Sequence, residues 1–168
     1  MAQVNVPGDY ETIQDGIDAA SEGDTVLVAP GTYSGEGNID LYFDGASITV
    51  MSANGPESTI IDCDTDGDGV GEERGITFDD SESNTSVFDG FTIINGDHSD
   101  GGGILIEESS PIIQNCIITS CAAEDGGGIY IDYSAATLIN VIVSNNVSDG
   151  NAGGIYITES DVVVLSNV

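Results

Sequence analysis

One acidic segment of the chain, residues 62–73, has the residue types needed to bind a metal ion. It reads Asp-Cys-Asp-Thr-Asp-Gly-Asp-Gly-Val-Gly-Glu-Glu, so carboxylates stand at every second position of its first half. A hard cation such as Ca²⁺ takes about six to eight oxygen ligands, and clustered carboxylates on a sharply turning loop supply them. The segment therefore predicts a calcium loop whose candidate ligands are Asp62, Asp64, Asp66, Asp68 and Glu73.

The spacing matches the EF-hand calcium loop, which has ligands at positions 1, 3, 5 and 12 and a glycine at position 6. These positions are filled here by Asp62, Asp64, Asp66, Glu73 and Gly67. The Asp68 carbonyl falls at the seventh position. Gly69 stands where the EF-hand has an aliphatic residue, and no helix-forming segment flanks the loop. The segment thus resembles the isolated calcium loops of dockerins and thrombospondin repeats. A solvated acidic insertion in an acidic chain is the alternative.

The composition is strongly acidic. The 168 residues include 30 Asp and Glu but 1 Lys or Arg, for a net charge of −29. Such a surface repels nucleic acid and anionic membranes, and no apolar run approaches the ~20 residues that span a bilayer. Cations would relieve the repulsion within the folded chain. Bound calcium and the salt adaptation of a halophile's surface protein are therefore both open explanations.

The candidate loop must be positioned by a repeating architecture. Three segments join small residues, mostly glycine, to an Ile-x-Ile strand pattern: residues 100–106, 125–131 and 151–157. Ile104, Ile129 and Ile155 follow one another at about 25 residues. A repeat of this length, with a glycine turn and a β-branched strand in each unit, predicts a parallel β-solenoid whose coils stack on one another.

Other columns repeat at the same interval. The columns expected to face inward are Phe91, Cys116, Val141 and Ile93, Ile118, Val143. Asn115 and Asn140 also align, and they would either pass amide hydrogen bonds from coil to coil or simply form turns. The column of Leu105, Tyr130 and Tyr156 should face outward, as a ladder between strands or a flat surface for a partner. Three cysteines without paired spacing predict no disulfide framework.

A second acidic feature follows from this register. Asp100, Asp125 and Asn151 fall in one column before the glycines, with Asp97 and Asp149 nearby. Like charges stacked on adjacent coils repel, and a cation between coils would relieve this. Hydrated turn aspartates are the alternative explanation.

The N-terminal segment predicts a cap for the first coil. Within residues 10–21, apolar residues at Tyr10, Ile13, Ile17 and Ala20 describe one face of a helix. Asp9 is the expected residue at its start, and Gly23 the expected end. A solenoid exposes an apolar end at its first coil, which such a helix would cover.

The same region carries a family resemblance. The runs Val6-Pro7-Gly8-Asp9-Tyr10, Ile17-Asp18-Ala19-Ala20, Gly23-Asp24-Thr25-Val26-Leu27-Val28 and Pro30-Gly31-Thr32-Tyr33 resemble the opening of the pectin-lyase-like right-handed parallel β-helix superfamily. The Gly-Gly-Gly-Ile coils resemble polymorphic outer-membrane proteins and other bacterial surface β-helices. The resemblance implies an all-β, right-handed parallel β-helix with a short N-terminal capping helix. It implies no single activity, because the superfamily holds lyases, hydrolases, adhesins and inert stalks.

These features define one domain, residues 1–168, with an N-terminal cap (1–24), coils (25–168) and a calcium-loop insertion (62–75). The chain stops within the strand pattern of 161–168. We therefore expect either that the natural chain continues past Val168 or that another molecule covers this end. Self-association through the uncapped C-terminal coil would be one such cover.

The residues argue against a lyase. The β-helix lyases use Ca²⁺ to acidify a uronate and Lys or Arg as the base, but the only basic residue here is Arg74, and the expected role for it is an ion pair. His98 is a lone loop histidine, and nothing marks a pair of carboxylates for hydrolysis. The sequence favours a secreted or cell-surface structural or adhesive module stabilised by Ca²⁺. Its other partners would be a polysaccharide or another surface protein. The alternative is a carbohydrate-active β-helix, either a polysaccharide lyase or similar to a glycoside hydrolase.

Overall fold

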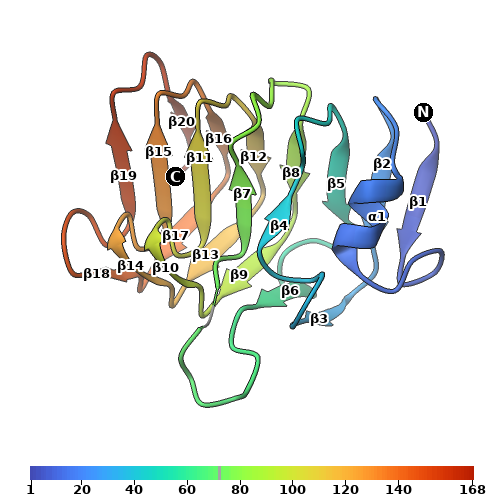
Figure 1. The fold of residues 1–168 in the computed structure, drawn as a ribbon, viewed down its shortest axis with the longest axis horizontal. Coiled ribbons are helices and arrows are strands. Elements are labelled where there is room, and N and C mark those ends of the chain that lie inside the picture. Colours follow the sequence, from blue (N-terminus) through green and yellow to red (C-terminus); the bar gives the residue numbers. More distant parts are fainter. Residues whose placement is uncertain (72) are drawn as a thin grey trace.

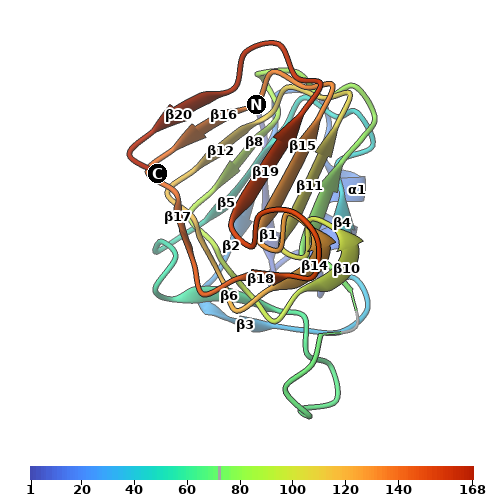
Figure 2. The same cartoon turned by 90° about the vertical axis from the view of Figure 1, so that its left-hand side faces the viewer.

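A computed structural model describes residues 1–71 and 73–168. Its strands form four parallel sheets in which neighbours come from successive coils. The sheets follow one another around each coil, and the coils stack along one axis to build a β-solenoid (Figures 1 and 2). The all-β solenoid predicted from the glycine repeat is confirmed.

We number the sheets in the order in which a coil visits them. The first contains β1 (Gln3–Val6), β2 (Thr25–Val28), β5 (Thr49–Ser52), β8 (Val87–Asp89), β12 (Ile112–Gln114), β16 (Thr137–Ile139) and β20 (Val164–Ser166). The second contains β3 (Gly31–Tyr33), β6 (Thr59–Asp62), β9 (Thr92–Ile94), β13 (Ile117–Thr119) and β17 (Ile142–Ser144). The third contains β10 (Asp97–Asp100), β14 (Ala122–Asp125) and β18 (Val147–Ser148). The fourth contains β4 (Leu41–Tyr42), β7 (Ile76–Phe78), β11 (Ile104–Glu107), β15 (Ile129–Asp132) and β19 (Ile155–Thr158).

The core is built from columns of stacked apolar side chains. In the first sheet the register aligns the fully buried Val26, Val50, Phe88, Ile113 and Leu138. Both columns predicted from the 25-residue interval are aligned in the second sheet or beside it, and their members in the earlier coils are buried. Apolar burial along such columns is the main stabilising term of the fold.

The asparagine column serves both of the purposes that the sequence left open. Asn140 Nδ2 donates to Asn115 Oδ1 over 3.1 Å, and Asn167 Nδ2 donates to Asn140 Oδ1 over 2.8 Å. The ladder begins at Asp89, whose Oδ1 accepts from Asn115 Nδ2 over 2.8 Å. The three asparagines also have φ near +54° (52°, 54° and 55°), a left-handed conformation that Asn tolerates better than most residues.

Glycine is required in the repeat for two different reasons, backbone conformation at the first glycine and lack of space at the third. Gly101 and Gly126 have φ of +61°, which favours glycine. Gly103 is needed for space, because a Cβ there would lie 2.5 Å from Ile118 Cγ2 and 2.7 Å from the Gly128 carbonyl oxygen of the next coil. Gly128 is crowded in the same way by the Gly154 carbonyl. Coils can therefore approach closely at this corner only without side chains.

The N-terminal helix is present, but its predicted start was wrong. Helix α1 spans Ile13–Ala19, and Thr12 is its N-cap, with Oγ1 accepting from Asp15 N over 3.1 Å. Asp9 instead accepts from the backbone and side chain of Asn5, closing the preceding turn. A capping side chain must reach a free N–H of the first turn, and Thr12 is the residue placed to do so.

The face of α1 that packs on the coils is shorter than predicted. Ile13 and Ile17 are buried, whereas Tyr10 is 40% exposed. The helix packs against β1, β2 and β4, at the N-terminal end of the stack (Figure 1). Gly16 permits this approach, since a Cβ there would lie 2.8 Å from Val6 Cγ2. The short helix therefore covers the first coil, as a cap should.

The last coil has aliphatic side chains that are open to solvent. Exposed residues on its strands are Ile142, Val147, Ile157, Val164 and Leu165. Leu165 continues the core column of Leu138, and Ile157 continues that of Ile131. Self-association through this coil stays a prediction. Among the described residues, no helix is long and apolar enough to cross a membrane.

The thiols of the core should be chemically silent. Burial raises the pKa of Cys116 to about 12 and that of Cys121 to about 11. Because the thiolate is the reactive form, native protein at a pH of about 8 should label at neither residue with a disulfide reagent. The same reagent in concentrated guanidinium chloride should label both. Rapid labelling of either thiol in the native protein would contradict this burial.

Candidate functional site

The predicted calcium loop joins a strand of the second sheet to a strand of the fourth sheet. It leaves the end of β6 and enters β7, and it projects away from the stacked coils (Figure 1). Its root is fixed, because Cys63 is buried and its N–H donates to the Ile94 carbonyl of the next coil over 3.0 Å. From Thr65 to Val70 the loop is exposed.

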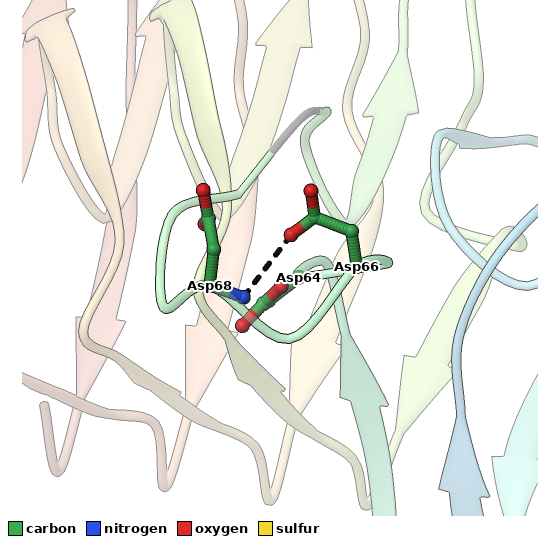
Figure 3. A group of neighbouring side chains, drawn as sticks. All are labelled: Asp64, Asp66 and Asp68. Atoms are coloured by element: carbon green, nitrogen blue, oxygen red, sulfur yellow. Dashed lines mark hydrogen bonds between the residues drawn. The ribbon is translucent and has the colours of Figure 1, made fainter.

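Three carboxylates converge at the turn of this loop. Asp64, Asp66 and Asp68 each offer an oxygen, and the three oxygens lie within 4.8 Å of one another (Figure 3). Gly67, between Asp66 and Asp68, has a φ of +81°, and Gly69, directly after Asp68, has a φ of +87°. Glycine is the residue best suited to that conformation, which brings successive aspartates to one side.

The carboxylates are oriented by backbone N–H groups of the same loop. Asp64 Oδ1 accepts from Gly67 N over 2.6 Å, and its Oδ2 accepts from Gly69 N over 2.8 Å. Asp66 Oδ1 accepts from Asp68 N over 3.1 Å (Figure 3). Asp68 Oδ1 accepts from Val70 N over 2.8 Å. A carboxylate oxygen has two lone-pair directions, so these bonds orient the group and still leave it able to bind a cation.

The other two predicted ligands lie outside this group. Asp62 Oδ1 accepts from Asp64 N over 3.2 Å and from Asn95 Nδ2 over 2.9 Å, at the end of β6. Glu73 lines a surface hollow with Glu36, Asp40 and Thr65. The sequence explains the difference. The pattern Asp-x-Asp-x-Asp-Gly occurs at residues 62–67 and again at residues 64–69, so the first ligand of a calcium loop can be placed at Asp62 or at Asp64. In the structure the second glycine, Gly69, follows the three grouped carboxylates.

The donor set can be tested against the metal that the sequence predicts. All three grouped ligands are carboxylates, and hard oxygen donors suit Ca²⁺ or Mg²⁺ rather than zinc or copper. The buried sulfur of Cys63 belongs to the core. Three negative charges within 4.8 Å repel one another unless a cation is near. These residues therefore fit a hard divalent cation.

The single arginine occupies the other end of the loop, where an ion pair was expected; its hydrogen bonds to described residues are instead to a threonine and a histidine. Arg74 is only 5% exposed. Its Nη1 donates to Thr77 Oγ1 over 3.4 Å, and its Nη2 bonds to His98 Nδ1, which must then be the acceptor nitrogen. Burial lowers the pKa of Arg74, while the nearby groups that include Asp40 and Asp100 raise it. His98 is therefore a partner of Arg74, not a lone loop residue. The two residues are 24 positions apart in the sequence, close to the length of one coil, and this spacing could have predicted their contact.

The second acidic feature also has its predicted register. Asp100 lies opposite Asp125 in the parallel pairing of β10 and β14. Asp125 Oδ1 accepts from the side-chain amide of Asn151 over 3.0 Å, and also from its backbone N–H. The amide at the third position thus replaces a repulsive contact by a hydrogen bond.

Comparison with known proteins agrees with this architecture. Residues 15–168 match a family described as the right handed beta helix region. A search of the curated proteins found no match, and a search of the solved structures found none either. The match covers nearly the whole chain, including α1 from its third residue, the predicted calcium loop and the last coil. The chain belongs to the right-handed β-helix family.

Proposed function

We propose that this β-helix is a calcium-stabilised structural or adhesive module that works outside the cell. The observation that carries the proposal is the convergence of Asp64, Asp66 and Asp68 within 4.8 Å on a loop between two sheets. The proposed ligands are these three carboxylates. Backbone carbonyls and water would complete the shell that calcium prefers.

The ion would stabilise the fold by holding the connection between β6 and β7. Without a cation the three carboxylates repel one another, and with one they attract it jointly. Binding to the folded chain alone raises stability by mass action. Calcium would thus act on the same corner at which Arg74 is buried.

The proposed location follows from the chemistry of the loop. Exposed calcium sites in extracellular modules bind with dissociation constants of about 10⁻⁴–10⁻³ M, which suits the calcium concentration outside cells. A surface with a net charge of −29 and a long stack of coils is suited to a role as a spacer or a binding platform. The resemblance to bacterial surface β-helices supports the same placement.

Calorimetric titration with CaCl₂ tests the site directly. One ion should bind per chain with a dissociation constant of about 10⁻⁴–10⁻³ M. Asp66→Asn should weaken binding about tenfold or more, whereas Asp62→Asn and Glu73→Gln, outside the group, should weaken it less. Asp18→Asn, an equal loss of charge on the exposed face of α1, is the matched control. Binding that is absent, or that responds equally to Asp66→Asn and Asp18→Asn, would refute the proposed site.

A further inference from the structure

The outer face of the fourth sheet presents a continuous row of side chains. The parallel register aligns Tyr42, Thr77, Leu105, Tyr130 and Tyr156, which we call the outer row. Residues on either side of each member in its strand point into the core, as the fully buried Ile104 and Ile106 show. Row members from Leu105 onward are partly exposed. The row thus forms a strip along the axis of the stack.

One end of the outer row already holds a guanidinium group. Arg74 Nη1 donates to Thr77 Oγ1, which places the guanidinium over that row position. Thr77 is only 2% exposed as a result. The charged and aromatic groups that act on Arg74 include Asp40, Tyr42 and Asp100. The chain therefore shows one guanidinium held at this surface by a threonine hydroxyl and a histidine ring, within reach of the charges of Asp40 and Asp100.

The same groups recur further along the row. The rings of Tyr130 and Tyr156 lie 5.5 Å apart at their centroids with a tilt of 50°. Burial raises the pKa of Tyr130, and the carboxylates of Asp132, Asp100 and Asp125 raise it further, so acids lie around this ring. Arg74 lies at the Thr77 position of the row. The chain has no other arginine or lysine, so none of its own cations can bind beside Tyr130 and Tyr156.

An incompletely bonded carboxylate marks the same place. Asp132 Oδ1 is buried and has no hydrogen-bond partner among residues 1–71 and 73–168. A buried acceptor without a donor is costly. Asp132 as a whole is partly exposed, so a charged donor from another molecule can reach its carboxylate group. Asp132 stands two residues after Tyr130 in β15, on the same outward face.

We propose that the outer row from Leu105 to Tyr156 binds an arginine-rich segment of a partner protein. Guanidinium groups would stack on Tyr130 and Tyr156, as guanidinium does on aromatic faces. Asp100, Asp125 and Asp132 would accept their hydrogen bonds. The net charge of −29 would attract such a segment from a distance. This inference names the partner chemistry for the adhesive role proposed above, and it does not depend on calcium at the loop.

Calorimetric titration with the peptide acetyl-(Arg-Gly)₄-amide tests the proposal, in buffer at physiological salt with millimolar CaCl₂. The peptide should bind, and the same peptide with citrulline in place of arginine should not, because citrulline keeps the shape and loses the charge. Tyr130→Leu should weaken binding about tenfold, the scale of a partly desolvated cation–π contact. Tyr130→Phe, which keeps the ring, should bind like the parent protein.

Matched controls separate the row from diffuse attraction to an acidic protein. Asp132→Asn should weaken binding more than Asp18→Asn does, and Tyr133→Leu, at an exposed tyrosine outside the row, should have no effect. The calcium-loop variant Asp66→Asn should bind the peptide normally, which keeps failure of this inference distinct from failure of the calcium site. Equal losses for Asp132→Asn and Asp18→Asn, or no loss for Tyr130→Leu, would overturn the proposal. Circular dichroism of each variant establishes that it is folded.

Discussion

Replacing Gly103 by alanine is expected to lower the free energy of unfolding by about 3 kcal/mol, near the upper end of the usual cost of overpacking. The added Cβ would lie 2.5 Å from Ile118 Cγ2 and 2.7 Å from the Gly128 carbonyl oxygen. That oxygen cannot simply move, since it accepts a hydrogen bond from Gly103 N over 3.0 Å. The new methyl group must therefore separate two coils. Urea unfolding followed by circular dichroism measures the loss.

The same substitution two coils later in this column provides the control. Gly154 occupies the equivalent place in the last coil, where a Cβ would lie 3.9 Å from Val143 Cγ1, an ordinary contact. Its φ is not in the left-handed range, so alanine there should be neutral or slightly stabilising, because it restricts the unfolded chain. If Gly103→Ala and Gly154→Ala cost the same, close approach between coils is not the reason for the glycine repeat.

Removal of calcium is expected to have an effect of similar size. At a free calcium concentration about 100 times the dissociation constant, binding contributes about 2.7 kcal/mol to stability. For a chain of this length that corresponds to a rise in Tm of about 5–11 °C. Thermal melts with EDTA and with excess CaCl₂ should therefore differ by this amount in the parent protein. In the Asp66→Asn variant, a tenfold loss of affinity would reduce the contribution to about 1.4 kcal/mol, so the difference between its melts should be about half that of the parent protein or less.

A salt series distinguishes a specific ion from general screening. Sodium chloride screens the −29 surface without supplying a divalent ion, so at matched ionic strength it should restore only part of the calcium effect. Full recovery by NaCl alone would contradict a calcium site and favour adaptation of the acidic surface to salt. The same series run on Asp66→Asn provides the effect of screening by itself.

The stacking of the coils could be predicted because residues that stack on one another recur in the sequence at a fixed interval. Ile104 and Ile129 pair in the structure as their 25-residue separation indicated. The boundary of α1 could not be predicted in the same way. Asp9 and Thr12 are both good capping residues, and only the path of the turn decides that Asp9 bonds to Asn5.

The site was only partly predictable, because side-chain grouping depends on local turns. The carboxylates of Asp64, Asp66 and Asp68 lie together, whereas the EF-hand spacing gave Asp62 and Glu73 equal standing as candidate ligands. A buried acid was missed as well. Glu82 is 2% exposed, and its N–H donates to Ser109 Oγ in a column that continues to Ser134. Glu82, Ser109 and Ser134 follow one another at about the length of a coil, and this spacing could have predicted their hydrogen-bonded column.

The coil that carries the proposed calcium loop also shows how this fold tolerates changes in length. From Val50 to Phe88 the core column of the first sheet advances by 38 residues, whereas from Phe88 to Ile113 it advances by 25. The register of the column is the same across both steps. Of the 13 additional residues, 6 lie between β5 and β6, 4 between β6 and β7 and 3 between β7 and β8, as the strand registers give. All three connections of this coil are therefore longer while the core register is kept, and we expect the β6–β7 corner to be one of the places that accept a grafted segment. A recombined chain could exchange this acidic segment for another sequence while the strands of the surrounding coils keep their pairing.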